Sequence, residues 1–343
     1  WDFLAIQPAI DYLRQSMPSL GGDTCVVIRD TQTYSEAVQV RGFTNNGFQF
    51  KIMSDPSFVS SAPVVNPPSF STAGFYVQNS SVTILNVSVI STNSVSYGVY
   101  ASSDYVTISS VNVDAGGNIT QAGMRISSWT TVSYSSVTVG DSHGFWLNGS
   151  TMSSVSYSAA VNNSADNHAF YLDSGKNNAF SVIFASNSHI SGRGFYLKGS
   201  DTNTVTQSYV WGGSSGTVLV QGSDYNTISL SSSIGRAWTG LYHNGSSSNT
   251  VTRSYMWGGL RGAQWDTAST SNVISLSTMI GVCGHGVFVF MGDSNTVTQS
   301  RMESVNGWGV YLSISADYNT ISLSTMISAG STTTGLYFNQ ASS

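Results

Sequence analysis

Asparagine recurs at a nearly constant interval through the second half of the chain. It lies in two almost identical strings, TNTVTQSYVWGG at 202–213 and SNTVTRSYMWGG at 248–259. A period between 20 and 50 residues is typical of a solenoid, in which each repeat packs on the next. The six copies are 23 residues apart, except for a last step of 24, at positions Asn203, Asn226, Asn249, Asn272, Asn295 and Asn319.

Within each repeat the apolar residues alternate with polar ones, which is typical of strands rather than helices. A segment of the form Gly-apolar-X-apolar, or a close variant, occurs twelve times, from GFYV at 74 to GLYF at 335. Such a short unit has no core of its own, so successive units must stack at the strand spacing of ~4.8 Å. The pattern predicts an all-β parallel solenoid. Asparagine tolerates the left-handed backbone of a sharp bend, and its amide can bond the asparagines above and below.

The N-terminal region carries a resemblance to known proteins. In AIQPAIDYLRQSM, residues 5–17, the apolar side chains Ile6, Ile10, Leu13 and Met17 share one helical face. The following CVVIRDTQTYSEAVQV, 25–40, resembles the first rung of pectin methylesterase-like proteins. The whole chain resembles right-handed parallel β-helix proteins of the pectate lyase type, whose asparagine ladders lie at such a bend. The resemblance implies a right-handed parallel β-helix with an N-terminal capping helix.

We expect two parts in this chain. Residues 1–70 form a cap with the helix, the first rungs and a proline-rich loop at 54–69 that leaves the stack. Residues 71–343 form the regular rungs as one continuous domain. The start lacks the basic region of a signal peptide, and the end, GLYFNQASS, stops within the pattern. An open solenoid end is a template for further strands, so we expect a C-terminal continuation or contact with further copies.

Composition excludes several classes of protein. Charged residues are only 8%, but 40% hydrophobic and 12% aromatic residues indicate a packed core rather than disorder. The net charge of -5 disfavours nucleic acid as a partner, and no apolar run is long enough for a transmembrane segment. Cys25 and Cys283 lie too far apart along a stack for a disulfide and are expected in the core. Low charge with abundant Ser, Thr and Asn favours an extracellular or cell-surface location.

Titratable residues align on three rungs that begin at Gly144, Ala169 and Gly194. Paired carboxylates with a neighbouring histidine suit acid/base work on glycosidic bonds, and an arginine can hold a uronate carboxylate. The resemblance also implies that enzymes of this fold place such residues on successive rungs. The candidate catalytic residues are Asp141, His143, Asp166, His168 and Arg193.

Two missing motifs and one alternative explanation weaken this catalytic hypothesis. The acidic calcium cluster of pectate lyases and the paired Asp and Gln pattern of methylesterases are not found, so we predict no metal and no cofactor. The same residues can be solvated turn residues. Asp173 and Lys198, which align in another column with Asn148, would then form a surface ion pair.

The X position of the repeated segment must face outward, because the apolar residues on either side face the core. X is aromatic in nine of twelve rungs, and the others carry Arg125, Leu219 and Gln264. Stacked aromatics can simply stabilise a sheet. Aromatic rings with exposed hydroxyls also bind sugar faces or proteins. The candidate binding residues are Tyr76, Tyr100, Trp146, Tyr171, Tyr196, Tyr242, Tyr311 and Tyr337, with Phe288 in the same column.

A 46-residue alternation overlies the single-rung repeat. Trp211 and Trp257 occur only in every second rung, which indicates growth by duplication of two-rung units. We find no regular exposed Thr-X-Thr column of the kind that ice binding would use. The sequence predicts an extracellular rod that binds a polysaccharide or cell-surface glycan through its aromatic column. The alternative is a polysaccharide lyase, hydrolase or epimerase acting on a uronate-containing polymer.

Overall fold

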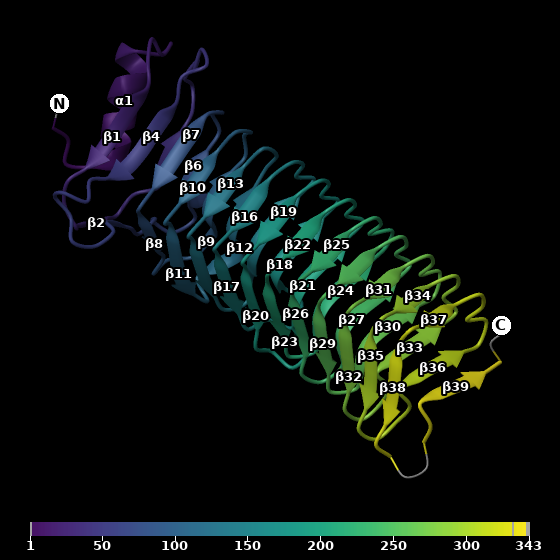
Figure 1. Cartoon of the computed structure of the whole chain (residues 1–343). Coiled ribbons are helices and arrows are strands. Elements are labelled where there is room, and N and C mark those ends of the chain that lie inside the picture. The colour runs from purple at the N-terminus through teal and green to yellow at the C-terminus, as the bar shows by residue number, and fades with distance from the viewer. Residues whose placement is uncertain (1, 331–332, 341–343) are drawn as a thin grey trace. The chain divides into compact units, whose positions relative to one another are not determined.

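The computed structural model describes residues 2–330 and 333–340 (Figure 1). The chain folds into two compact units, Trp1–Asn163 and Ser164–Ser343, called unit 1 and unit 2 below. Each unit consists of three parallel sheets, to which every coil of the chain contributes one strand per sheet. The predicted right-handed parallel β-helix is therefore confirmed, with about 13 turns in the described chain. The boundary expected at residue 70 stays a prediction.

Unit 1 begins with the helix α1 (Ile6–Ser16) and continues with seventeen strands in its described part. The first sheet contains β1 (Thr24–Ile28), β4 (Phe50–Ser54), β7 (Val82–Leu85), β10 (Thr107–Ser109), β13 (Thr131–Ser133) and β16 (Ser154–Ser156). The second contains β2 (Thr33–Tyr34), β5 (Val64–Val65), β8 (Ser88–Ile90), β11 (Asn112–Gly116), β14 (Ser136–Val139) and β17 (Ala159–Asn162). The third contains β3 (Val38–Val40), β6 (Ala73–Val77), β9 (Val95–Ala101), β12 (Ile119–Ile126) and β15 (His143–Asn148).

Unit 2 repeats the same order of sheets. Its first sheet contains β19 (Ala179–Ser181), β22 (Thr204–Thr206), β25 (Thr227–Ser229), β28 (Thr250–Thr252), β31 (Val273–Ser275), β34 (Thr296–Thr298) and β37 (Thr320–Ser322). The second contains β20 (Phe184–Asn187), β23 (Tyr209–Gly212), β26 (Ser232–Gly235), β29 (Tyr255–Gly258), β32 (Thr278–Gly281), β35 (Arg301–Ser304) and β38 (Thr325–Ser328). The third contains β18 (His168–Asp173), β21 (Arg193–Lys198), β24 (Ser215–Val220), β27 (Thr239–Asn244), β30 (Arg261–Asp266), β33 (Val287–Phe290), β36 (Val310–Ser313) and β39 (Leu336–Asn339).

The predicted capping helix is confirmed and closes the N-terminal end of unit 1. It packs against β1 and β3 through Ile6, Ala9 and Ile10, which are buried. Glu36 accepts hydrogen bonds from the backbone N–H groups of Ile6 (2.7 Å) and Gln7 (3.0 Å) at the helix start. A carboxylate at this end satisfies unpaired N–H groups and complements the helix dipole.

The asparagines of unit 2 are buried in the bend before each first-sheet strand. The Asn249 Oδ1 accepts hydrogen bonds from the backbone N–H (2.8 Å) and the side-chain Nδ2 (3.1 Å) of Asn226. Asn249 in turn donates to the Oδ1 of Asn272 through its backbone N–H (3.0 Å) and its Nδ2 (3.1 Å). The asparagine of each coil therefore accepts hydrogen bonds from the asparagine of the preceding coil. A second column, of serines from Ser208 to Ser324, follows the other end of these strands. The backbone N–H of each serine donates to the hydroxyl oxygen of the serine one coil later.

Two expectations about the core and loops were wrong. Cys25 and Cys283 are exposed rather than buried, because Cys25 takes an outward position in β1 and Cys283 lies in the loop after β32. The proline-rich segment does not leave the stack altogether, since its Val64–Val65 pairs in parallel with β2 and β8. The final residues, 341–343, lie outside the described chain.

A regular hydroxyl array was also missed. The outward positions of the first sheet in unit 2 carry threonine or serine on most strands, and the hydroxyls bond each other in pairs. Ser229 donates to Thr206 (3.2 Å) and Ser275 donates to Thr252 (3.0 Å). A Thr-X-Thr/Ser column is thus present. It was not recognised in the sequence because serine replaces threonine on several strands and Val273 interrupts it.

Candidate functional site

The outer face of the third sheet carries the predicted aromatic column, and its register can be read strand by strand. In unit 1, Tyr76 pairs with Tyr100, Tyr100 with Arg125, and Arg125 with Trp146. The two tyrosine rings are stacked at 5.0 Å with an interplanar angle of 9°. The Arg125 guanidinium lies 4.9 Å from the Tyr100 ring centre and 4.6 Å from that of Trp146. The cation completes a continuous stack in this unit.

In unit 2 the same column begins with Tyr171 on β18 and Tyr196 on β21, with ring centres 5.8 Å apart. Tyr196 pairs with Val218, not with Leu219 as expected, and Val218 pairs with Tyr242. The repeated segment in β24 is shifted by one residue, so Leu219 faces the core. The column then continues through Gln264, Phe288, Tyr311 and Tyr337.

The small Val218 leaves a notch between Tyr196 and Tyr242. The notch is an open depression of about 450 Å³. Val218 and Val220 form its apolar floor, and the two tyrosines lie on neighbouring strands to either side. Since neighbouring strands are ~4.8 Å apart, the strands that carry the two walls are separated by about 9.6 Å. The lining also includes Arg193, Gln221, Trp238, Asn244 and Gly245.

Arg193 is the one charged residue among the described residues that line the notch. Its guanidinium lies 5.1 Å from the Tyr196 ring centre. The pKa of Tyr242 is raised, first by burial and then by its 2.9 Å hydrogen bond to Asp266, while the charge of Arg193 acts to lower it. The arginine therefore acts electrostatically across the width of the notch. Aromatic walls, an apolar floor and one cation can hold a sugar ring that carries a polar or acidic substituent.

Trp238 extends the far wall of the notch. Its ring centre lies 5.0 Å from that of Tyr242. Sequence reasoning did not select Trp238 or Val218. The signal for Val218 was present in the spacing, because GTVL at 216–219 aligns with the other segments and TVLV at 217–220 does not.

The predicted catalytic residues are distributed over both units. Asp141 and His143 belong to unit 1, at the turn and first residue of β15, whereas Asp166, His168 and Arg193 belong to unit 2. His168 and Arg193 are paired in register, as expected, and so are Asp173 and Lys198. The five-residue catalytic cluster stays a prediction.

The histidines and Arg193 contact the aromatic column. The His143 ring lies 5.7 Å from the Trp146 ring. The His168 ring lies 4.3 Å from that of Tyr196, and the Arg193 guanidinium also lies over the Tyr196 ring. These contacts make His168 and Arg193 part of the same surface as the notch.

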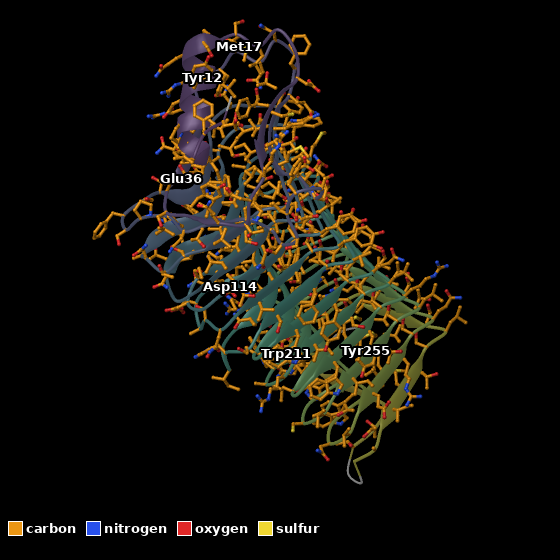
Figure 2. The ribbon with its side chains drawn as sticks, turned by 90° about the vertical axis from the view of Figure 1, so that its left-hand side faces the viewer. Tyr12, Met17, Glu36, Asp114, Trp211 and Tyr255 are labelled. Carbon is orange, nitrogen blue, oxygen red and sulfur yellow. The ribbon has the colours of Figure 1, made fainter. Side chains whose placement is uncertain are left out.

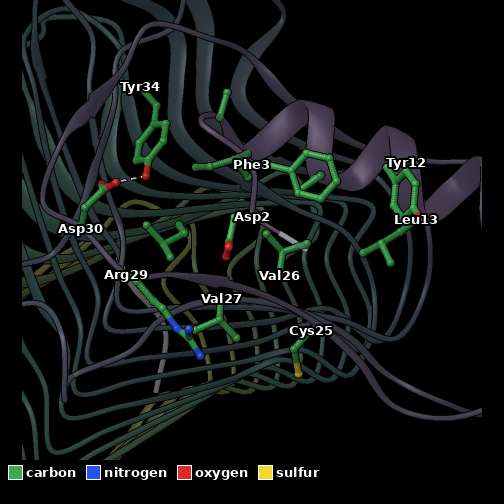
Figure 3. Close-up of a pocket in the computed structure, with 14 residues that line it drawn as sticks. Asp2, Phe3, Tyr12, Leu13, Cys25, Val26, Val27, Arg29, Asp30 and Tyr34 are labelled. Atoms are coloured by element: carbon green, nitrogen blue, oxygen red, sulfur yellow. Dashed lines mark hydrogen bonds between the residues drawn. The ribbon is translucent and has the colours of Figure 1, made fainter.

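A second concavity, of about 270 Å³, lies between α1 and β1 (Figure 3). The hydroxyl of Tyr34 donates a 2.7 Å hydrogen bond to Asp30 at its rim. Burial, followed by this hydrogen bond, raises the pKa of Tyr34. The remaining lining is mostly apolar side chains of the helix and the first strand, so we assign this concavity to the packing of the cap.

Comparison with known proteins places the chain among β-helix folds. The family model described as periplasmic copper-binding protein (NosD) matches residues 181–343, which is less than half of the chain. No curated protein matches the sequence. No helix of the described residues is long and apolar enough to cross a membrane.

Several solved structures are similar in fold. The A-module of the Azotobacter vinelandii mannuronan C-5 epimerase AlgE4 aligns with a TM-score of 0.60 at 14% identity, covering 98% of this chain and 94% of its own. The catalytic domain of a GH87 α-1,3-glucanase, solved with tetrasaccharides, aligns with a TM-score of 0.55 at 11% identity, covering 98% and 64%. The Dettilon tailspike protein aligns with a TM-score of 0.52 at 12% identity, covering 85% and 62%. At these identities the likeness concerns the fold alone.

The NosD description raises the question of copper, for which histidine, cysteine and methionine are suitable ligands. His243 is completely buried between Leu219 and Trp265, and its pKa is lowered to about 3 by burial. Exposed Cys283 and buried His285 are not joined by further ligands, since the described residues contain no group of three His, Cys, Asp or Glu side chains that could hold a metal. Met256, Met279 and Met302 pair in register but fill the core. The described residues do not fit a copper site.

Proposed function

We propose that the protein is an extracellular or cell-surface β-helix that binds a polysaccharide or cell-surface glycan on the outer face of its third sheet. The observation that carries the proposal is the notch at Val218, with Tyr196 and Tyr242 as walls and Arg193 beside them. The predicted binding residues of unit 2, from Tyr171 to Tyr337, extend the same surface. The similarity of residues 181–343 to a periplasmic family supports a location outside the cytoplasm.

Two variants test the notch. Tyr196→Ala with Tyr242→Ala removes both walls, and Val218→Phe fills the space between them. Each is expected to reduce retention in affinity electrophoresis on the polysaccharide that retains the wild type, by about tenfold or more in affinity. Tyr225→Ala is the matched control, because Tyr225 is 65% exposed at a bend away from the notch. Equal losses in the control and in the notch variants would contradict the proposal.

The second candidate function is cleavage or epimerisation of a uronate-containing polymer. It is favoured by His168 and Arg193, which pair in register next to the notch. In this proposal Asp141, His143 and Asp166 complete the acid/base groups. Mass spectrometry of polymers incubated with the wild type and with His143→Ala/His168→Ala separates the two functions. New oligosaccharides from the wild type alone would establish catalysis, and retention without products would favour binding.

A further inference from the structure

A second surface lies on the outer face of the second sheet of unit 2, and neither the repeat nor the notch accounts for it. Each strand turns its first and third residues outward. From β20 to β32 the strands pair in register, so these residues form two straight columns. The first column is Phe184, Tyr209, Ser232, Tyr255 and Thr278, and the second is Ser186, Trp211, Ile234, Trp257 and Ile280.

The two columns differ in chemistry. The second is a half-buried apolar rail from Trp211 to Ile280. In the first, the exposed Tyr209 and Tyr255 alternate with the hydroxyl residues Ser232 and Thr278. Figure 2 labels Trp211 and Tyr255 on the face turned toward the viewer. An apolar strip beside a strip of hydroxyls matches a sugar chain, whose rings have apolar faces and polar edges.

The turns that follow the tryptophans are tightly packed, and two rings of the first column stack on each other. The glycine after each tryptophan closes a tight turn, and a Cβ on Gly258 would lie 1.8 Å from the carbonyl oxygen of Arg261. Gly212 stands in the same relation to Ser215. The Phe184 ring stacks on that of Tyr209 at 5.6 Å with an interplanar angle of 4°. A shallow depression of about 550 Å³ opens over this pair and Trp211. Such a surface loses little freedom on binding.

The spacing between the Tyr–Trp pairs of this surface indicates which ligand fits it. Tyr–Trp pairs recur on every second strand, at β23 and β29, which are about 9.6 Å apart. This step is comparable with the length of a disaccharide. In a chain of β-1,4-linked pyranoses, alternate rings are flipped, so every second ring presents the same edge. A chain that lies along the stacking direction would therefore meet equivalent side chains at every second ring.

The surface also selects an uncharged polymer. Neither column contains a charged residue from Phe184 to Ile280, and the next strand introduces the Arg301–Glu303 ion pair at 2.6 Å. We infer that the second sheet of unit 2 binds an uncharged, extended β-1,4-linked polysaccharide along the Trp211–Ile280 rail. This site is separate from the notch at Val218 and does not depend on it.

The test uses chain length as its readout. Isothermal titration calorimetry compares cellohexaose and chitohexaose with their disaccharides on the wild type, Trp211→Ala, Trp257→Ala and the double variant. We expect one of the hexasaccharides to bind about tenfold or more tightly than its disaccharide. Loss of one tryptophan should remove most of this preference, whereas Trp129→Ala, an exposed tryptophan of unit 1, should leave it unchanged.

Three outcomes would overturn the inference. Hexasaccharide and disaccharide could bind equally or not at all, which would remove the two-ring spacing argument. Binding could disappear as the salt concentration is raised, which would indicate a charged ligand. Sedimentation could show that the wild type self-associates and that the double tryptophan variant does not, in which case the surface is an interface between copies of this chain. Circular dichroism of each variant confirms that the β-helix persists.

Discussion

The two units build the same bend with different side chains. Before each first-sheet strand, unit 2 places asparagine, whereas unit 1 places Val106, Thr130 and Ser153 at the aligned positions. Unit 1 also contains register shifts between Asp114 and Gly116 and between Ile119 and Ala122. From Asn203 onward, the nearly constant repeat of unit 2 therefore coincides with a side chain that bonds both neighbouring coils. The register shifts of unit 1 occur where other residues take the place of this amide.

The aromatic column differs between the units in a related way. In unit 1 Arg125 fills the space between Tyr100 and Trp146, so the stack is closed. In unit 2 the small Val218 lies between Tyr196 and Tyr242, where all three residues line a depression. One column can thus serve the stability of one unit and binding in the other.

The largest expected effect concerns the bend. Asn249→Ala removes the acceptor of two hydrogen bonds from Asn226 and a donor to Asn272, all buried. We expect unit 2 to lose about 2–4 kcal/mol of its free energy of unfolding. Ser153→Ala in unit 1 removes the acceptor for the N–H of Thr130. The other partners of Ser153, the Ser150 hydroxyl and the Ser127 carbonyl, remain bonded to each other, so the cost should be about 1–2 kcal/mol. Hydrogen exchange followed by mass spectrometry measures both units separately. Equal losses would remove the distinction between the two bends.

For each pH unit, a smaller effect is expected from acid. The pKa of His243 is about 3 in the folded state because of burial, and about 6.5 in an unfolded chain. The unfolded state therefore binds the proton first, and stability of unit 2 should fall as the pH decreases from about 6.5 toward 3. The slope is about 1.4 kcal/mol per pH unit for this group.

The variant His243→Leu isolates this contribution. Leucine already occupies the paired position 219 on β24, so the core can accept it. Urea unfolding at several pH values should show a shallower acid dependence in the variant. An unchanged slope would assign the acid sensitivity to other groups.

The smallest expected effect concerns the closed stack of unit 1. Arg125→Gln removes a cation that lies over the rings of Tyr97, Tyr100 and Trp146 and donates a hydrogen bond to the Tyr97 hydroxyl. The change should cost about 0.5–1 kcal/mol. The pKa of Tyr100 is raised by burial and lowered by Arg125, so it should rise further in the variant. Ultraviolet titration of tyrosine measures this shift, with Arg253→Gln in unit 2 as the control. An unchanged tyrosine titration would show that Arg125 does not act on the stack.

The sequence was sufficient for the architecture because the period itself carries the information. Residues 23 apart in the sequence pair in register, as in Thr204 with Thr227, and the alternation of burial follows. The site was less predictable. The expected alignment of β24 was wrong by one residue and placed Leu219, not Val218, in the outward column. A shift of one residue along a strand moves every side chain to the opposite face of the sheet, so the notch was not predicted. The exposure of Cys25 depended on the same parity.

The candidate catalytic residues illustrate a different limit. Alignment gave the register of His168 with Arg193 correctly, because both rungs have 25 residues. It did not reveal that both side chains contact Tyr196. Backbone register follows from spacing, but the direction of a long side chain depends on which neighbours leave room for it.

The asparagine and serine columns give the chain a direction of assembly. The N–H of Asn203 donates to Asn226 and that of Ser208 donates to Ser231, both one coil later in the sequence. In a newly formed coil, the N–H groups at the two bends therefore lack these hydrogen bonds until the next coil folds. During synthesis, which proceeds from the N-terminus, each emerging coil would complete the one already in place. The growing end alone would then remain incomplete, as it does in a polymer that elongates at one end.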